Sequence, residues 1–478
     1  MNFHDLQPMA LGVLLAAAAA LVLLTDLFTK PSTKPNLGWL TFGLLSAVLV
    51  ASFTLDLRGE VASHVWRGGA WPVFLARLFL VAGLITVLGG MDHIARKWTY
   101  RQGEFYTVLL LCLTGMVLLP GARDLVLLIV CFELMGIPLY ILTAFAKTDS
   151  GPKPVEAALK LFLIGAGSTA LTVFGAALLA GLAGTTDMSV LVSSTLSPLQ
   201  GIGTMLLLAG LAFKIGVAPF HMWVPDTYEG APTPVVAFLS VAPKVGGFAT
   251  LVMVLWQALP RLIHVWGPVT LVLCALTLTV GNLGAIAQRN IKRLLAYSGV
   301  GQVGYVLLGL LSGREFGVAM MLFYLAAYVV TNLGVFLVAH AVAEAGDGET
   351  ISSFDGLGRR SPWLAMSLLL FLLSLAGIPF VAGFWAKFFV FVAAWRAGQS
   401  EMVLVGALFA TVALFYYLGV ARAAYVNVSA KTEKIVVSRA LAGAIIACLL
   451  AVVGLGAWPS PVVEAAMAAA RSVSGIGP

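Results

Sequence analysis

Charged residues are scarce in this sequence. Lysine, arginine, aspartate and glutamate together make up 10% of the 478 residues, against about 25% in a typical soluble domain. Hydrophobic residues make up 60% of the chain, and its mean hydropathy is +1.00. No soluble fold has a core large enough to bury so much apolar surface. The composition therefore excludes a set of soluble domains and predicts a polytopic membrane protein.

Cysteine is sparse, and the common cofactor-binding motifs are missing. The four cysteines lie in apolar runs without paired spacing, as is typical of small buried hydrophobic residues: Cys112, Cys131, Cys274 and Cys448. The sequence contains no phosphate-binding loop, no dinucleotide fingerprint, no Cys/His metal spacing and no intramembrane histidine pair of the haem type. We therefore expect this chain to bind no metal or redox cofactor of its own.

Long apolar runs are abundant. Cutting the sequence at charged and Pro/Gly clusters leaves fourteen apolar segments, namely 9–28, 37–55, 73–91, 104–120, 123–146, 154–183, 199–220, 234–258, 266–287, 292–312, 316–343, 363–395, 402–425 and 436–458. Their length suits membrane-crossing helices, and they lack the alternation of a membrane β-barrel. We predict an all-α polytopic membrane protein with about 14 transmembrane helices and short connections.

The basic residues predict how the chain is oriented. If the N-terminus lies outside, 16 of the 28 lysines and arginines fall in inside loops and 7 in outside loops. This bias favours an even number of spans with both termini outside the cytoplasm. It also accounts for most of the net charge of +7, so we expect no nucleic acid partner. The first apolar run, Met9–Phe28, lacks the basic segment that precedes the apolar run of a cleaved signal peptide.

A few charged residues are predicted to lie inside spans. The basic ones are Arg77, Lys160, Lys214, Lys244 and Lys387, and the acidic one is Glu133. A charge at the bilayer centre costs roughly 3 kcal/mol, and substrate or ion pathways are the usual reason to keep one. Arg77 and Lys160 lie near span ends and could instead extend to the interface. Glu133 could simply neutralise one lysine as an ion pair.

Three of these lysines lie beside predicted helix breaks. Lys214 precedes Gly216 and Pro219, Lys244 follows Pro243, and Lys387 follows Gly377, Pro379 and Gly383. Proline frees a helical carbonyl, and in a membrane such a group persists only where protein or a water-filled cavity satisfies it. Broken helices in both halves of a chain are typical of transporters built from inverted repeats. A lysine at such a break can change its charge state, as a proton relay requires.

His221 closes the first broken segment and opens the connection 221–234, which contains three prolines and a glycine. We expect this connection to be stiff and non-helical and to carry Asp226 and Glu229. A single histidine near a span end is more often interfacial than catalytic, so His221 is a candidate for the relay with a strong structural alternative.

Traces of repetition divide the chain. Arg123 precedes one span much as Arg289 and Lys292 precede another, and the broken segments around Lys214 and Lys387 recur at a similar interval. We predict three N-terminal helices in residues 1–103, a first five-helix repeat in 104–258, a second in 259–430, and a C-terminal helix and tail in 431–478.

Two stretches of the sequence are specific enough to identify a family. One is Phe213–Phe248, with Phe-Leu-Ser-Val-Ala-Pro-Lys at 238–244, and the other is Gly281–Gly309, with Gly-Asn-Leu-Gly-Ala-Ile-Ala-Gln-Arg-Asn-Ile-Lys-Arg-Leu-Leu-Ala-Tyr-Ser at 281–298. Phe132-Glu133-Leu134 and Ala158-Leu159-Lys160 fit as well. With these motifs the chain resembles, over nearly its whole length, the antiporter-like membrane subunits of bacterial NADH–quinone oxidoreductase (respiratory complex I), in particular the subunit N family.

The resemblance implies two inverted five-helix repeats, each with a broken helix, and a hydrophilic axis along the middle of the membrane. It implies these roles: Glu133 as the acidic partner of Lys214, Lys160 as a further lysine near the glutamate, Lys244 as the central link, and Lys387 as the lysine of the second repeat. One position differs, because many members have a histidine where this chain has Gln302. A glutamine can hydrogen-bond but cannot hold a proton charge near neutral pH.

From these features we expect a proton-translocating subunit of NADH–quinone oxidoreductase in the bacterial inner membrane. Partner subunits would bind NADH, FMN, iron–sulfur clusters and quinone, and sister antiporter-like subunits and lipid would surround this chain. Two alternatives stay open. One is a subunit of a multisubunit cation/proton antiporter or of a related membrane-bound hydrogenase-type complex. The other is a structural scaffold whose charges only pin helices together.

Overall fold

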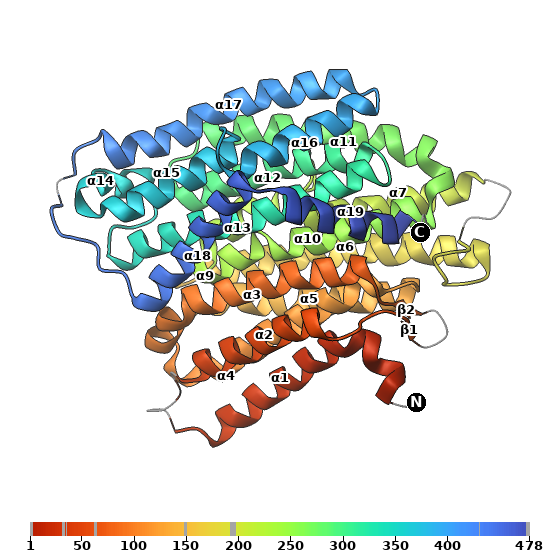
Figure 1. Ribbon diagram of the computed structural model, residues 1–478, viewed down its shortest axis with the longest axis horizontal. Coiled ribbons are helices and arrows are strands. Elements are labelled where there is room, and N and C mark those ends of the chain that lie inside the picture. Colours follow the sequence, from red (N-terminus) through yellow and green to blue (C-terminus); the bar gives the residue numbers. More distant parts are fainter. Residues whose placement is uncertain are drawn as a thin grey trace.

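The fold is a bundle of long helices. A computed structural model describes residues 3–30, 34, 36–61, 65–147, 151–191, 197–429 and 431–474. Within these residues, 13 helices are long and apolar enough to cross a membrane, and most run along the long axis of Figure 1. The described residues contain one sheet, a short antiparallel hairpin of β1 (Glu60–Val61) and β2 (Trp66–Arg67). The predicted all-α polytopic membrane fold is confirmed.

The helices follow the predicted segments closely. The N-terminal part contains η1 (Phe3–Met9), α1 (Ala10–Phe28), α2 (Asn36–Thr54) and α3 (Ala70–Lys97). Next come η2 (Thr99–Arg101), α4 (Gln102–Leu118), η3 (Leu119–Gly121), α5 (Leu125–Thr143), α6 (Lys153–Ala183), α7 (Pro198–Ile215), α8 (Trp223–Gly230), α9 (Thr233–Leu239), α10 (Ala242–Leu251) and η4 (Val252–Ala258). The rest consists of η5 (Pro260–Leu262), α11 (Ile263–Ile286), α12 (Ile291–Leu311), α13 (Phe316–Glu344), η6 (Ile351–Phe354), α14 (Leu357–Arg360), α15 (Pro362–Ala376), α16 (Ala382–Arg396), α17 (Ser400–Tyr425), α18 (Arg439–Ala457) and α19 (Ser460–Ser474).

The twelfth predicted segment, 363–395, is a broken helix. It divides into α15 and α16, each of 15 residues. Gly377 caps α15 in the left-handed conformation with φ of 87°, which costs glycine little because it has no Cβ. Gly216 caps α7 in the same way with φ of 76°. Both broken helices that the proline and glycine positions predict are therefore present.

The prediction for residues 221–234 is wrong, because most of this connection is helical. It forms α8 and the start of α9. Pro225 lies in the first turn of α8 and Pro234 in the first turn of α9, where a helix needs no backbone N–H donor. The prolines therefore begin helices here instead of preventing them.

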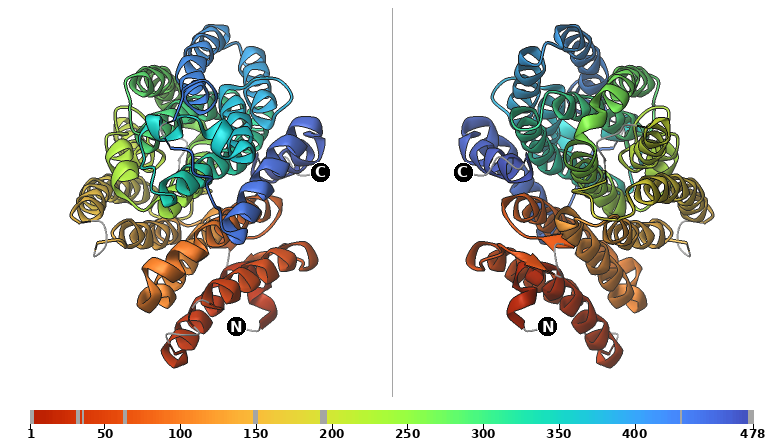
Figure 2. Two further views of the ribbon diagram at one scale, coloured as in Figure 1. Left: turned by 90° about the vertical axis from the view of Figure 1, so that its left-hand side faces the viewer. Right: turned by 90° about the vertical axis from the view of Figure 1, so that its right-hand side faces the viewer.

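Burial separates the central helices from the peripheral ones. In the most apolar 18 residues of each span, the buried share is 100% for α13 and for the span Thr233–Ala258. It is 28% for α17 and 33% for the N-terminal span Leu6–Phe28. In Figure 2 the N-terminal helices α1 and α2 lie at one edge of the molecule and α19 lies along its side. The four cysteines are buried and unpaired, as predicted.

Matching features recur in the two halves of the chain. The side chain of Asp124 caps the N-terminus of α5, and that of Asn290 caps α12. Each capping residue also pairs with the segment that follows the next long helix, Asp124 with Asp187 and Asn290 with Thr350. The same kind of cap and the same kind of bridge therefore occur twice in the described chain.

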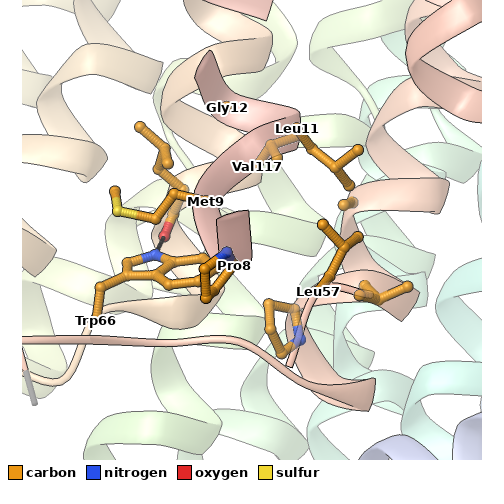
Figure 3. A pocket seen from close by; sticks show the side chains of 11 residues that line it. Pro8, Met9, Leu11, Gly12, Leu57, Trp66 and Val117 are labelled. Atoms are coloured by element: carbon orange, nitrogen blue, oxygen red, sulfur yellow. Dashed lines mark hydrogen bonds between the residues drawn. The ribbon is translucent and has the colours of Figure 1, made fainter. Parts of the chain in front are cut away.

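An apolar pocket near the N-terminus plays a structural part. It has a volume of about 10 Å³ and is lined by η1, the hairpin and the ends of α3 and α4 (Figure 3). The indole nitrogen of Trp66 donates a hydrogen bond to the carbonyl of Leu118 at 2.7 Å. None of its lining residues titrates, so this pocket is not the site of proton chemistry.

Candidate functional site

Lys214 and Glu133 form an ion pair inside the membrane-spanning region. The Nζ atom of Lys214 lies 3.4 Å from Oε1 of Glu133 and donates a hydrogen bond to the hydroxyl of Tyr140 at 3.1 Å. Thr169 on α6 donates to the same carboxylate oxygen at 2.7 Å. A Cβ on Gly136 would lie 2.8 Å from Nζ, so a larger residue there would force the ammonium group to shift.

The local sequence explains why these groups meet. Glu133, Gly136 and Tyr140 are spaced three and seven residues apart on α5, which places them on one helix face. Lys214 occupies the last turn of α7, just before the break at Gly216. The break thus places the side chain of Lys214 at the same level as the carboxylate of Glu133 on α5.

Lys244 lies deeper and has only neutral partners. It is 2% exposed, and its Nζ donates to the carbonyl of Gly299 at 3.1 Å and to the hydroxyl of Tyr328 at 3.2 Å. No carboxylate within the described residues forms an ion pair with it. Pro243 occupies the second position of α10, so the chain breaks before the proline, at Ser240 between α9 and α10.

Lys387 binds the broken end of α15. Its Nζ donates to the carbonyls of Leu375 and Ala376, both at 2.9 Å. The last carbonyls of a helix have no partner within it, and here the lysine of α16 supplies one. The ring of Tyr305 lies 4.7 Å from the same nitrogen. As with Lys244, the described part of the chain offers this lysine no carboxylate.

Gln302 connects the surroundings of the last two lysines. Its amide nitrogen donates to the Leu375 carbonyl at 3.0 Å and to the Tyr417 hydroxyl at 3.1 Å, and its oxygen accepts from Tyr324. A cavity of about 10 Å³ lies between Gln302, Leu375 and Tyr328, the last a partner of Lys244. This volume is close to the minimum for one water molecule. A nearly continuous set of polar groups therefore links Lys244 with Lys387.

Lys160 has carboxylate partners other than Glu133. It pairs with Glu156 at 2.7 Å and with Asp226 at 3.0 Å. Thr169, the partner of Glu133, is nine residues further along α6, or about 13 Å at 1.5 Å per residue. The side chain of Lys160 is 43% exposed, which fits the alternative that it extends towards the interface.

A charged cluster surrounds Lys160 at one end of the bundle. Arg293 donates to Asp226 at 2.8 Å and to Glu229 at 3.0 Å. Burial raises the pKa of Asp226, but the hydrogen bonds from Arg293 and Lys160 outweigh it, so its pKa lies below the ordinary value. Asp226 is therefore a carboxylate at neutral pH and holds α6, α8 and α12 together.

His221 and Arg77 lie outside the lysine axis. His221 is half-buried between α7 and α8, and its ring centroid lies 6.2 Å from that of Tyr297. Burial lowers the pKa of His221, so its ring is neutral at pH 7. Arg77 donates to the carbonyl of Ser52 at 2.6 Å and stacks on Phe53, which is the geometry of a residue that ties α3 to α2.

Apart from Gln302, sequence reasoning missed the uncharged polar groups around the lysines, Glu133 and Gln302. These are Tyr140, Thr169, Ser298, Tyr305, Tyr324, Tyr328 and Tyr417. A signal was available, because polar residues on α12 and α13 recur at helical spacing. Ser298, Gln302 and Tyr305 follow one face of α12, and Tyr324 and Tyr328 follow one face of α13.

Comparisons with known proteins agree with this architecture. Residues 122–413 match the family described as NADH:quinone oxidoreductase/Mrp antiporter, transmembrane. NADH-quinone oxidoreductase subunit N 2 of Roseiflexus castenholzii is 38% identical over 93% of this chain and 92% of its own. NADH-quinone oxidoreductase subunit N of Moorella thermoacetica is 38% identical over 97% and 98%.

Solved structures show the same fold. A chain of respiratory complex I from Thermus thermophilus with bound aureothin has a TM-score of 0.81 and 31% identity, covering 95% of this chain and 98% of its own. A chain of the Mrp complex from Dietzia sp. has a TM-score of 0.86 at 20% identity, covering 99% and 98%, a likeness of fold alone. The chain belongs to the NADH:quinone oxidoreductase/Mrp antiporter family and, within it, to the branch of NADH–quinone oxidoreductase subunit N.

Proposed function

We propose that this chain is a proton-translocating membrane subunit of NADH–quinone oxidoreductase, and that Glu133, Lys214, Lys244 and Lys387 carry its protons. One observation supports this most strongly. Three buried lysines stand beside three helix breaks, and among the described residues Lys214 alone of the three has a carboxylate partner. A charge buried without a counter-ion costs several kcal/mol, so such lysines are retained for a reason beyond stability. Lys160 and His221 lie outside this axis, and we assign them no transfer step.

In this proposal the ion pair is the coupling element. Redox energy released in partner subunits, which would bind NADH, FMN, iron–sulfur clusters and quinone, would weaken the contact between Glu133 and Lys214. The proton of Lys214 would then pass by way of Lys244, Gln302 and ordered water to Lys387. Each charge that crosses the membrane needs about 2.3 kcal/mol per 100 mV, so the two ends of the path must not open together.

We also propose that the two units, residues 104–258 and 259–430, each contribute one half of this path. The recurring caps at Asp124 and Asn290 support such a division. An even number of spans would place both termini outside the cytoplasm. The described parts of the two chain ends lie toward the same end of the bundle, on the right in Figure 1, which supports that arrangement.

The test is Lys244→Met in the assembled complex. Protons translocated per NADH oxidised should fall in inverted membrane vesicles, because the methionine keeps the side-chain volume and removes the charge. Lys97→Met, at an exposed lysine of α3, is the matched control and should translocate protons normally. An unchanged proton ratio in fully assembled Lys244→Met complex would refute the relay.

The same preparation separates the alternatives. A complex that reduces quinone with NADH supports the proposed assembly, whereas cation-dependent proton exchange without NADH oxidation would indicate an antiporter. A purely structural role predicts that Lys244→Met reduces the amount of assembled complex while leaving its proton ratio unchanged.

A further inference from the structure

Two histidines and a glutamate converge where α3 packs against α13, apart from the lysine axis. The side chains are those of His93 on α3 and of His340 and Glu344 on α13. One ligand atom from each of the three lies within 4.8 Å of the other two. His93 Nδ1 is 2.7 Å from a carboxylate oxygen of Glu344, and the two imidazole rings lie 5.1 Å apart between centroids.

His340 is a buried histidine whose ring is available to bind a ligand. It is 3% exposed, and no protein group within the described residues hydrogen-bonds to its ring. Its side chain lines two cavities, of about 260 and 440 Å³, which the other two members of the cluster also line. These cavities can bring water or a metal ion to the ring of His340.

The geometry is close to that of a tetrahedral metal centre. Zinc binds imidazole nitrogen and carboxylate oxygen at about 2.0–2.2 Å, so ligand atoms in a tetrahedral site lie about 3.4 Å apart. Rotation of the side chains has to shorten the present separations, of up to 4.8 Å, by about 1.4 Å at most. His340 and Glu344 are one turn apart on the same face of α13, a spacing that suits a shared metal. The adjoining cavities leave the fourth position to water.

We propose that His93, His340 and Glu344 bind a divalent transition metal of the zinc type reversibly, with water as the fourth ligand. Arg96 would oppose binding, because its guanidinium holds the second carboxylate oxygen of Glu344 at 2.5 Å. The metal would therefore displace this ion pair, which makes the affinity moderate. His93 and Glu344 are 251 positions apart in the sequence, so no local ligand spacing reveals the site.

The test measures Zn²⁺ binding to the purified full chain in lipid nanodiscs, without a polyhistidine tag, by competition with a fluorescent zinc chelator. The wild type should bind one Zn²⁺ per chain at this site. His340→Ala and His93→Ala should each weaken binding at least about tenfold, since even an outer-shell group is worth 10–100-fold. His264→Ala removes an exposed imidazole of α11 and should leave binding unchanged.

Two further variants keep the test decisive if the alanine variants fold poorly. His340→Cys retains a zinc ligand and should keep most of the affinity. Arg96→Gln frees Glu344 and should tighten binding several-fold, an effect that general destabilisation does not produce. With Co²⁺ as the probe, the wild type should show the absorption bands of a tetrahedral site, and His340→Ala should lose them. Equal Zn²⁺ binding by wild type and His340→Ala, or no binding by the wild type, would overturn the proposal.

Discussion

Replacing Glu133 by glutamine is the sharpest test of the ion pair. Glu133→Gln keeps the shape of the side chain and an oxygen that can still accept the hydrogen bond of Thr169. It removes only the negative charge 3.4 Å from Lys214 Nζ. Within the described residues, Lys214 then keeps neutral acceptors in place of a counter-ion, namely the Tyr140 hydroxyl and the new amide oxygen.

The lost attraction is at most comparable with the work of translocation. Two unit charges separated by the 3.4 Å of this pair attract each other by at most about 5 kcal/mol at an effective dielectric constant of about 20. The Glu133 side chain is 24% exposed, and water screening lowers this value. Moving one proton against about 200 mV needs about 4.6 kcal/mol. The attraction is therefore of the same order as this work, and its removal should impair the loading of Lys214.

We expect Glu133→Gln to cut proton translocation per NADH strongly, while the complex still assembles. The assay compares inverted vesicles of the variant and the wild type, with complex content matched by quantifying the subunit. Glu401→Gln removes an exposed carboxylate from the first turn of α17 and serves as the control, with normal translocation expected. If Glu133→Gln translocates as many protons per NADH as the wild type, the pair has no part in coupling.

Three other predictions concern stability. Gly377→Ala places a Cβ 2.8 Å from the side chain of Lys387 at a backbone φ of 87° and should lower the free energy of unfolding by more than about 1–2 kcal/mol. The control Gly398→Ala also has a positive φ but has open space around it, so it should lose only the part due to backbone strain. Thermal unfolding of the detergent-solubilised chain measures both variants. Gln302→Leu leaves buried hydroxyl and carbonyl groups without their partner and should destabilise the chain by about 1–3 kcal/mol in the same assay. Burial raises the pKa of Asp347, but the hydrogen bonds from Arg360 and Lys431 lower it by more, so its pKa lies below the ordinary value. The contribution of Asp347 to the free energy of unfolding is therefore complete above about pH 4, and it is lost as the pH falls through the pKa of Asp347 in the folded chain. Asp347→Asn should lower the unfolding temperature at pH 7 and make that temperature fall less steeply in acid.

The sequence predicts the spans and the lysines well because the bilayer imposes strong constraints. An apolar run must be helical in lipid, so segment bounds follow directly from charge and hydropathy. Glycine at 216 and at 377 marks left-handed caps that other residues adopt only with strain. The wrong prediction, at 221–234, arose because a proline in the first turn of a helix looks the same in sequence as a proline that breaks one.

Contacts between distant residues are what the sequence could not predict. Lys160 and Asp226 lie on different helices, and nothing in the local pattern says that they pair. A motif match placed Lys160 near Glu133, but sequence similarity does not determine which of several carboxylates a long side chain reaches. The same limit applies to His93 and His340, which meet only because α3 and α13 pack together.

The three lysines differ in what stabilises a charge on them, and this difference suggests a direction for the proposed relay. Lys214 has a carboxylate at 3.4 Å, whereas the described residues offer Lys244 and Lys387 carbonyl and hydroxyl oxygens alone. A buried charge is costly without a counter-ion, so in this conformation a positive charge is held best at Lys214. Transfer to Lys387 is then uphill and needs energy from outside the chain. In the proposed mechanism, the subunit would translocate protons only while its partners pull the Glu133–Lys214 pair apart.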